Sequence, residues 1–367
     1  PGSHSLRSAT AANEFVSVTG GSQDYHLKDG ALALNAGTAL SSVFTTDVDG
    51  QIRPVGAAWD IGYDEAAASL SGGTVTNTYT IGTRTLNVDI TSVTGTPSEW
   101  TIQLAAADLS NVAVNDKLSD ETATTPKVWK VSGVDDANNT VTVIDSESNG
   151  GSPSAAGSSQ ATVGRFYATL TAWETARQGN LVARNAIEKG ELYNDAMFTA
   201  GVTIDGSTTD AARYMWLTVA EGHRHNGIAG TGVTIDPTAA GDRLQVLDPY
   251  TRVEGVRLTG FTGSANDQGG IEVNAVGGVV LDAVLIHDYP DATYSLNGIT
   301  VTGSGGEATI RNSLLYNGDL RGIHLTATGT GATVQNTTVY DADKSQGAGV
   351  GLLWSGGTLT AKNTVAM

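Results

Sequence analysis

The stretch Gly322–Asp341, "GIHLTATGTGATVQNTTVYD", decides the fold, because it has the composition of one unit of a repeat. A glycine and an aliphatic residue open an alternating run, a Gly-rich turn follows, and a second run ends in an aromatic residue. The preceding stretch Gly298–Asn317, "GITVTGSGGEATIRNSLLYN", has the same plan. Alternation of apolar and polar residues indicates strands.

The glycine–aliphatic pairs recur at spacings of 28, 24 and 27 residues along the C-terminal part of the chain. They stand at Gly270-Ile271, Gly298-Ile299, Gly322-Ile323 and Gly349-Val350. A repeat of this length with two or three strands per unit is typical of stacked coils. We therefore predict an all-β chain built on a right-handed parallel β-helix.

A polar residue also returns once per unit, at Asp282, Asn312, Asn336 and Asn363. Such a column could contact a ligand, or it could be a ladder in which the side chains bond to one another and to turn backbone. We favour the ladder, because a spacing that follows the structural repeat is what stacking requires.

A short helix is predicted before the first coils, which we place in Gly201–Ile235 and Arg243–Phe261. Thr171 and Glu174 have the spacing of a capping box, and Gly179 is a stop signal. An amphipathic helix at this position would cover the open first coil.

The composition excludes some partners. The net charge of −18 disfavours binding to nucleic acid and to anionic membranes, and no apolar stretch is long enough to insert into a bilayer. The absence of cysteine removes disulfides and cysteine metal sites. An acidic chain with 46 glycines suggests an extracellular or cell-surface protein.

Two segments resemble a known family of bacterial and metagenomic right-handed parallel β-helix exoproteins. Tyr167–Phe261, with "YATLTAWETARQG", "EGHRHNGIAGTG" and "YTRVEGVRLTGF", is similar to the opening of that family. Asp24–Glu65, with "DYHLKDGALALNAGT", "TTDVDGQIRPVG" and "WDIGYDE", is similar to its closing segment, although Tyr63 stands where the family pattern leads us to expect a small residue. The resemblance implies a fold rather than an activity, and here the closing segment comes first.

The reversed order leads to a four-part organisation. Residues 1–65 are predicted to close a β-helix, which we expect to belong to a neighbouring copy, and residues 161–367 to form this chain's own β-helix with its cap. Two alternatives stay open: the chain is one period of a longer tandem protein, or it is circularly permuted and its first segment closes its own β-helix. Residues 74–145 carry strand signals such as "KVWKVSGV" and "TVTVID" around the turn "DDANN", which suggest a small antiparallel barrel or sandwich. The Gly/Ser-rich residues 146–160 are interpreted as a linker or loop.

No catalytic or cofactor-binding set is predicted. Asp282, His287 and Asp288, with Asp291 nearby, form the densest titratable group, which we interpret as a polar turn. His223 and His225 flank Arg224 and could share a strand face, but zinc would need further ligands. The tryptophans could stack on sugars and are more typical of core or cap positions, namely Trp59, Trp100, Trp129, Trp173, Trp216 and Trp354.

The only local arrangement that resembles a calcium loop is Asp47-Val48-Asp49-Gly50. Because the downstream ligands of an EF-hand are missing, we favour a simple turn here. If calcium binds anywhere, Asp47 and Asp49 are its predicted ligands, and no cofactor is required.

The sequence thus predicts a non-enzymatic extracellular structural protein, the subunit or repeat of a head-to-tail filament, stalk or surface fibre. Its expected partners are other copies of itself, with surface polysaccharide as an additional ligand. The alternative is a carbohydrate-active or carbohydrate-binding β-helix, such as a lyase or glycosidase, which a groove with clustered carboxylates and aromatic residues would favour.

Overall fold

The computed structural model describes residues 11, 15–17, 24–27, 32–33, 74–96, 98–105, 109–120, 127–146, 152–153, 161–241, 243–289, 293–326, 329–342 and 349–366. The chain divides into two units, Pro1–Val75 and Thr76–Met367. In the first unit, β1 (Phe15–Ser17) and β2 (Asp24–Leu27) pair antiparallel, and Leu27 and Ala33 are buried.

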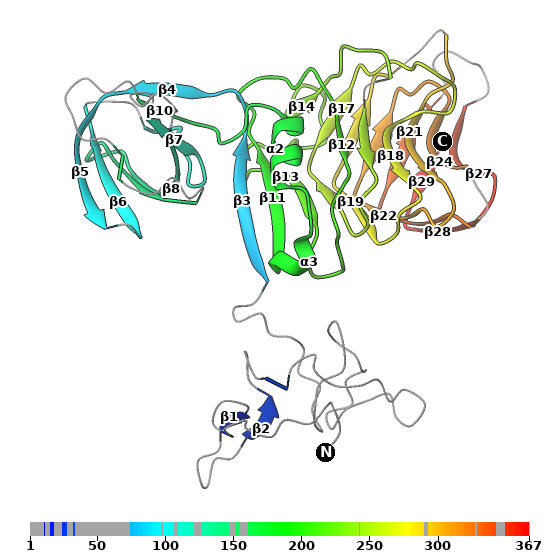
Figure 1. Ribbon diagram of the computed structural model, residues 1–367. Coiled ribbons are helices and arrows are strands. Elements are labelled where there is room, and N and C mark those ends of the chain that lie inside the picture. The colour runs from blue at the N-terminus through cyan, green and yellow to red at the C-terminus, as the bar shows by residue number, and fades with distance from the viewer. Residues whose placement is uncertain are drawn as a thin grey trace. The chain divides into compact units, whose positions relative to one another are not determined.

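A β-solenoid makes up most of the second unit (Figure 1). Its first sheet contains β12 (Val202–Ile204), β15 (Leu244–Val246), β18 (Gly269–Asn274), β21 (Asn297–Thr302), β24 (Arg321–Leu325) and β27 (Val350–Trp354). The second sheet contains β14 (Thr234–Ile235), β17 (Arg257–Thr259), β20 (Leu285–His287), β23 (Leu314–Tyr316), β26 (Thr338–Tyr340) and β29 (Val365–Ala366).

The third sheet contains β3 (Val75–Ile81), β11 (Ala186–Leu192), β13 (Met215–Val219), β16 (Arg252–Glu254), β19 (Val279–Asp282), β22 (Glu307–Arg311), β25 (Gly331–Gln335) and β28 (Thr358–Lys362). From β11 onward every neighbouring pair in this sheet is parallel. Each coil gives one strand to each sheet, so the predicted parallel β-helix is confirmed.

The glycine–aliphatic repeat places the aliphatic residue inside the solenoid. Ile271, Ile299 and Ile323 are in register on neighbouring strands of the first sheet, and all three are fully buried. Leu352 continues this column, so the stacked glycine of the last coil is Gly351. The sequence had predicted Gly349-Val350 as the fourth pair of the repeat, which is two residues before the pair Gly351-Leu352 that aligns with Gly322-Ile323.

The polar column forms the predicted ladder. The Nδ2 atom of each asparagine donates to the side chain one coil earlier: Asn312 to Asp282 at 2.8 Å, Asn336 to Asn312 at 3.3 Å, and Asn363 to Asn336 at 3.2 Å. All three asparagines have left-handed backbone, with φ between 49° and 53°. Ala283, and not Asp282, occupies the equivalent turn position, so Asp282 joins the ladder from the end of the preceding strand.

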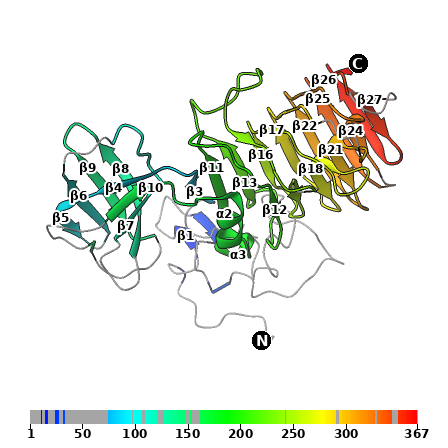
Figure 2. The ribbon, with the colours of Figure 1, turned by 90° about the horizontal axis from the view of Figure 1, so that it is seen from above.

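The predicted cap helix is α2 (Leu170–Arg177), followed by the short α3 (Leu181–Arg184). Its N-cap is Thr169, whose Oγ1 accepts from the Ala172 N–H at 3.0 Å, so the predicted capping box of Thr171 and Glu174 was wrong. Leu170 and Trp173 pack into the solenoid core. The helix α2 lies beside β11 and β12 of the first coil (Figure 2). No helix in the described ranges is long and apolar enough to cross a membrane.

A seven-stranded antiparallel sheet forms the additional β-structure. Its strand order is β4 (Thr85–Val88), β10 (Ala161–Gly164), β7 (Lys117–Asp120), β8 (Lys127–Asp135), β9 (Thr140–Ile144), β6 (Glu99–Leu104) and β5 (Ile90–Thr96). Only Asp89 separates β4 from β5, although they stand at opposite ends of the order, so the sheet must curl into a barrel. A second core around the fully buried Trp129 fills it.

The strands of the predicted segment 74–145 do not all belong to the barrel, because the first of them, β3, is part of the solenoid. β3, "VTNTYTI", lies beside β11 in the solenoid, because Tyr79 and Ile81 pack into the solenoid core. In exchange, β10 from beyond the Gly/Ser-rich segment completes the barrel between β4 and β7. The turn at "DDANN" joins β8 to β9 as a hairpin, as predicted.

Candidate functional site

A groove of about 490 Å³ lies on the outer face of the third sheet, over β11, β13 and β16. Strand alternation turns Lys189 and Glu191 outward, and the parallel register sets them beside Trp216 and Thr218. The groove is lined by Lys189, Glu191, Trp216, Thr218, Val219, Glu221, Arg224 and Glu254.

Glu254 is the centre of the polar contacts in this groove. Its carboxylate accepts from Trp216 Nε1 at 3.3 Å and from Thr218 Oγ1 at 3.4 Å, and it pairs with Arg224 at 2.9 Å. Lys189 Nζ lies 2.9 Å from Glu191 and 4.9 Å from the centroid of the Trp216 ring. The result is an indole face surrounded by carboxylates and cations, which can exchange hydrogen bonds with a hydroxyl-rich ligand.

The sequence drew attention to Trp216 and Arg224, but not as members of one site. It missed Lys189, Glu191 and Glu254, which come from strands far apart in the chain. The outward alternation in "AIEKGEL" and "MWLTV" was a usable signal. The register that brings the strands together was not, because these first coils lack the regular glycine–aliphatic spacing.

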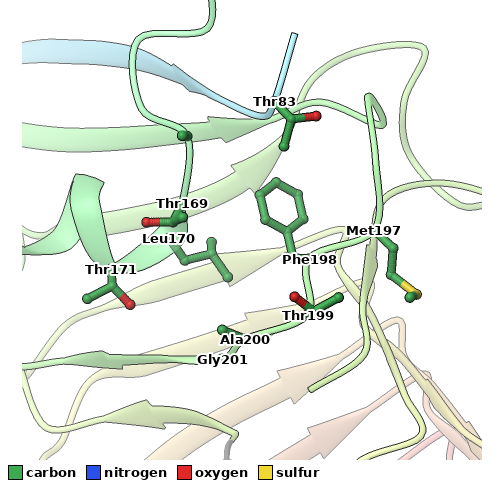
Figure 3. A pocket seen from close by; sticks show the side chains of 10 residues that line it. Thr83, Thr169, Leu170, Thr171, Met197, Phe198, Thr199, Ala200 and Gly201 are labelled. Carbon is green, nitrogen blue, oxygen red and sulfur yellow. The ribbon is translucent and has the colours of Figure 1, made fainter. Parts of the chain in front are cut away.

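A second, smaller pocket of about 140 Å³ lies beside the start of α2. Figure 3 shows Leu170 and Phe198 close together there, with Thr83, Thr169 and Thr171 at its margins. Among the described residues, those that line it are threonine, alanine, glycine, leucine, methionine and phenylalanine.

The structure does not assemble the predicted titratable group into one site. His287 Nδ1 lies 2.7 Å from Asp288 Oδ2, and its ring stacks on Tyr316. Asp282 instead pairs with Arg311 at 2.8 Å and takes part in the ladder. Asp291 lies outside the described residues.

His223 and His225 bind different partners. The Nδ1 atom of His223 accepts from the Asn194 N–H at 3.1 Å, whereas His225 Nε2 lies 2.7 Å from the Ala283 carbonyl oxygen. Burial lowers the pKa of His225. Among the described residues, no three His, Cys, Asp or Glu side chains converge as a metal cluster. Asp47 and Asp49 lie outside those residues, so the predicted calcium loop stays a prediction.

The last coil has a different kind of surface. Trp354 is in register with the fully buried Leu325 and continues its inward-facing column, yet 58% of Trp354 is exposed. Val350 and Val365 in the same coil are also exposed. Among the described strands, β27, β28 and β29 end the order of the three solenoid sheets.

No family model matches the chain, and neither the curated proteins nor the solved structures include a significant match to it. The functional argument therefore depends on the geometry of these surfaces.

Proposed function

We propose that the chain is a non-enzymatic structural protein of the extracellular space or cell surface, whose copies join head to tail into a filament or fibre. The exposed indole of Trp354 carries this proposal. Trp354 stands at an inward-facing position of the solenoid, where its neighbour Leu325 is fully buried, yet most of the Trp354 side chain is exposed. Large exposed apolar side chains in one place are typical of an interaction surface.

The backbone of the last coil supports the same proposal. The outer edges of β27, β28 and β29 carry N–H and C=O groups that can pair with another strand, and exposed edges of this kind recruit strands from other chains. An added coil would extend all three sheets and cover Trp354, Leu352 and Leu359 at once.

The proposed occupant is the segment 1–65 of an adjacent copy. Its motifs resemble the closing segment of a β-helix, which is the kind of element that would cover the exposed side of this coil. A contact between two non-identical surfaces repeats from copy to copy without closing, so it generates a fibre. The barrel would then be displayed once per subunit along it.

Sedimentation velocity and electron microscopy of the purified full chain test this proposal. Wild-type protein should form concentration-dependent oligomers and fibres, and Trp354→Glu should abolish them by placing a charge in the contact. Tyr340→Glu is the matched control, because Tyr340 is similarly exposed but faces outward from the second sheet. A wild type that stays monomeric at all concentrations, or equal assembly of the two variants, would contradict it.

A second function is favoured by the groove around Trp216, namely binding of a neutral carbohydrate. An indole face beside the carboxylates of Glu191 and Glu254 supplies both a stacking surface and hydrogen-bond partners for sugar hydroxyls. The net charge of −18 disfavours anionic polysaccharides. This function is compatible with assembly, because the groove lies over the first coils and the open surface on the last one.

A further inference from the structure

The loop of residues 222–232 lies between β13 and β14 and carries His223 and His225, with Arg224 between them. The loop closes tightly on itself. A Cβ at Gly232, where φ is 74°, would lie only 2.3 Å from the backbone nitrogen of His225. Side-chain contacts of the loop reach both the third sheet and the turn before β20, so its position depends on the few bonds that hold it there.

Each histidine holds the loop through a nitrogen that accepts a hydrogen bond from the backbone. His223 Nδ1 accepts from the Asn194 N–H at 3.1 Å, and His225 Nδ1 accepts from the Gly227 N–H at 3.3 Å. His225 Nε2 donates to the Ala283 carbonyl oxygen at 2.7 Å, because a carbonyl oxygen can only accept. A protonated imidazole carries a hydrogen on both nitrogens, so it can accept neither of the two N–H bonds. Both bonds therefore require neutral histidines.

The surroundings of His225 also oppose its protonation. Burial lowers the pKa of His225, and the hydrogen bond to the Ala283 carbonyl only partly offsets this effect. The neighbouring groups Arg257, Arg224 and His287 lower that pKa further. A proton on His225 would thus be buried beside other positive charges, which adds to the loss of the bond from the Gly227 N–H.

The surroundings of His223 have mixed charge. Its ring lies against the Tyr193 ring, with 4.9 Å between the centroids. The guanidinium of Arg165 stacks on the same Tyr193 ring and pairs with Asp195, while the carboxylate of Glu191 accepts from the Tyr193 hydroxyl at 3.4 Å. Positive and negative groups both stand around this contact, so the bond from the backbone is the interaction that protonation of His223 removes.

Arg224 connects this loop to the groove around Trp216. It pairs with Glu254 at 2.9 Å, and it donates to the Val219 carbonyl oxygen and to Thr218 Oγ1, each at 3.3 Å. These bonds hold the carboxylate that is the centre of the polar contacts in the groove. The histidines on either side of Arg224 keep its backbone where these bonds can form.

We propose that protonation of His223 and His225 releases this loop and so weakens binding of neutral carbohydrate in the groove, an inference that rests on the proposed carbohydrate function. In the neutral state Arg224 and Glu254 are in place before the ligand arrives. A ligand that binds the released state must also order the loop, which reduces its affinity. Because binding favours the neutral histidines, the affinity should fall as the pH drops below the ordinary histidine value of about 6.5.

Hydrogen–deuterium exchange of the full chain measures the loop without any ligand. The comparison is between wild type and the double variant His223→Asn/His225→Gln, whose amide side chains can still accept and donate hydrogen bonds but do not titrate. The ratio of wild-type to variant exchange at residues 222–232 should rise between pH 7.5 and pH 5. His324→Gln, which removes a buried histidine on β24, is the matched control and should exchange like wild type. An unchanged ratio would overturn the proposal.

Isothermal titration at the same two pH values measures the groove, with a neutral oligosaccharide selected on a glycan array at pH 7.5 as the probe. The wild-type affinity should fall several-fold from pH 7.5 to pH 5, whereas the double variant should keep its affinity. A constant wild-type affinity in protein whose loop is released would show that the loop does not regulate the groove. Failure of every neutral oligosaccharide to bind at either pH would contradict the carbohydrate function itself, and this regulation with it.

Discussion

Arg165 and Asp116 form an ion pair of 3.0 Å in which both side chains are almost completely buried, 3% and 0% exposed respectively. Arg165 follows the barrel strand β10, and Asp116 precedes β7. The same guanidinium donates from Nε to Asp195 Oδ2 at 2.8 Å, in the turn after β11, and stacks over the Tyr193 ring. One side chain thus ties the barrel to the first coil of the solenoid.

Replacing this arginine should therefore be strongly destabilising. Arg165→Met leaves the Asp116 carboxylate buried without its partner, which typically costs about 3–5 kcal/mol. The control Arg311→Met breaks the more exposed pair with Asp282, and pairs of that kind contribute at most about 1 kcal/mol. Urea unfolding measures both variants, and equal losses would contradict the importance of the buried pair.

The ladder predicts different results for two substitutions at one turn. Asn336→Ala removes the two ladder hydrogen bonds and places a Cβ with no local hydrogen bond at φ 49°, a backbone region that costs about 1–2 kcal/mol for such residues. Asn336→Gly removes the same hydrogen bonds but adopts that backbone freely. Thermal unfolding should rank alanine below glycine, and the reverse order would show that the backbone conformation is not the limiting factor.

Stability should fall as the pH drops below about 6.5, the ordinary histidine value. Burial lowers the pKa of both His225 and His324, and neighbouring arginines add to this effect. A folded-state pKa below the unfolded one stabilises the fold above the unfolded value, and this contribution is lost as the pH falls. In urea unfolding, the free energy of unfolding of the double variant His225→Gln/His324→Gln should fall less between pH 8 and pH 5 than that of the wild type. An equal fall in both proteins would contradict the role of these histidines.

If the groove binds neutral carbohydrate, Trp216→Ala should weaken binding by about tenfold or more through loss of the stacking face. Tyr340→Ala removes an exposed aromatic ring elsewhere and should leave binding unchanged. Isothermal titration with neutral oligosaccharides found in an array screen measures the difference. Absence of binding throughout, or equal losses in both variants, would exclude the groove as a carbohydrate site.

Local sequence signals predicted the coils well. The glycine–aliphatic repeat and the asparagine column follow the period of the fold, so they appear in the sequence as plainly as in the structure. The last coil was harder, because "GVGLLW" contains two glycines and only pairing with β24 selects Gly351 as the stacked one.

Features that depend on long-range packing were not predicted. "VTNTYTI" is an ordinary strand sequence, and contacts with residues far along the chain, such as the packing of Tyr79 and Ile81 into the solenoid core, place it on the solenoid. Thr169 and Thr171 both have side chains that suit an N-cap, so the sequence alone did not decide between them. The burial of Leu170 sets the start of the helix and makes Thr169 the N-cap. The groove required the register of β11 and β13, which no short motif encodes.

The most direct test of head-to-tail assembly is thiol cross-linking between copies, which the cysteine-free chain makes unambiguous. One copy carries Ser17→Cys on β1, and a second, differently tagged copy carries Thr360→Cys on the exposed last coil. A short bis-maleimide should join the two tags, whereas Thr203→Cys on the first coil should not replace Thr360→Cys in this reaction. A link formed only within the double variant Ser17→Cys/Thr360→Cys, in protein that stays monomeric, would show that the segment closes its own chain and would contradict assembly.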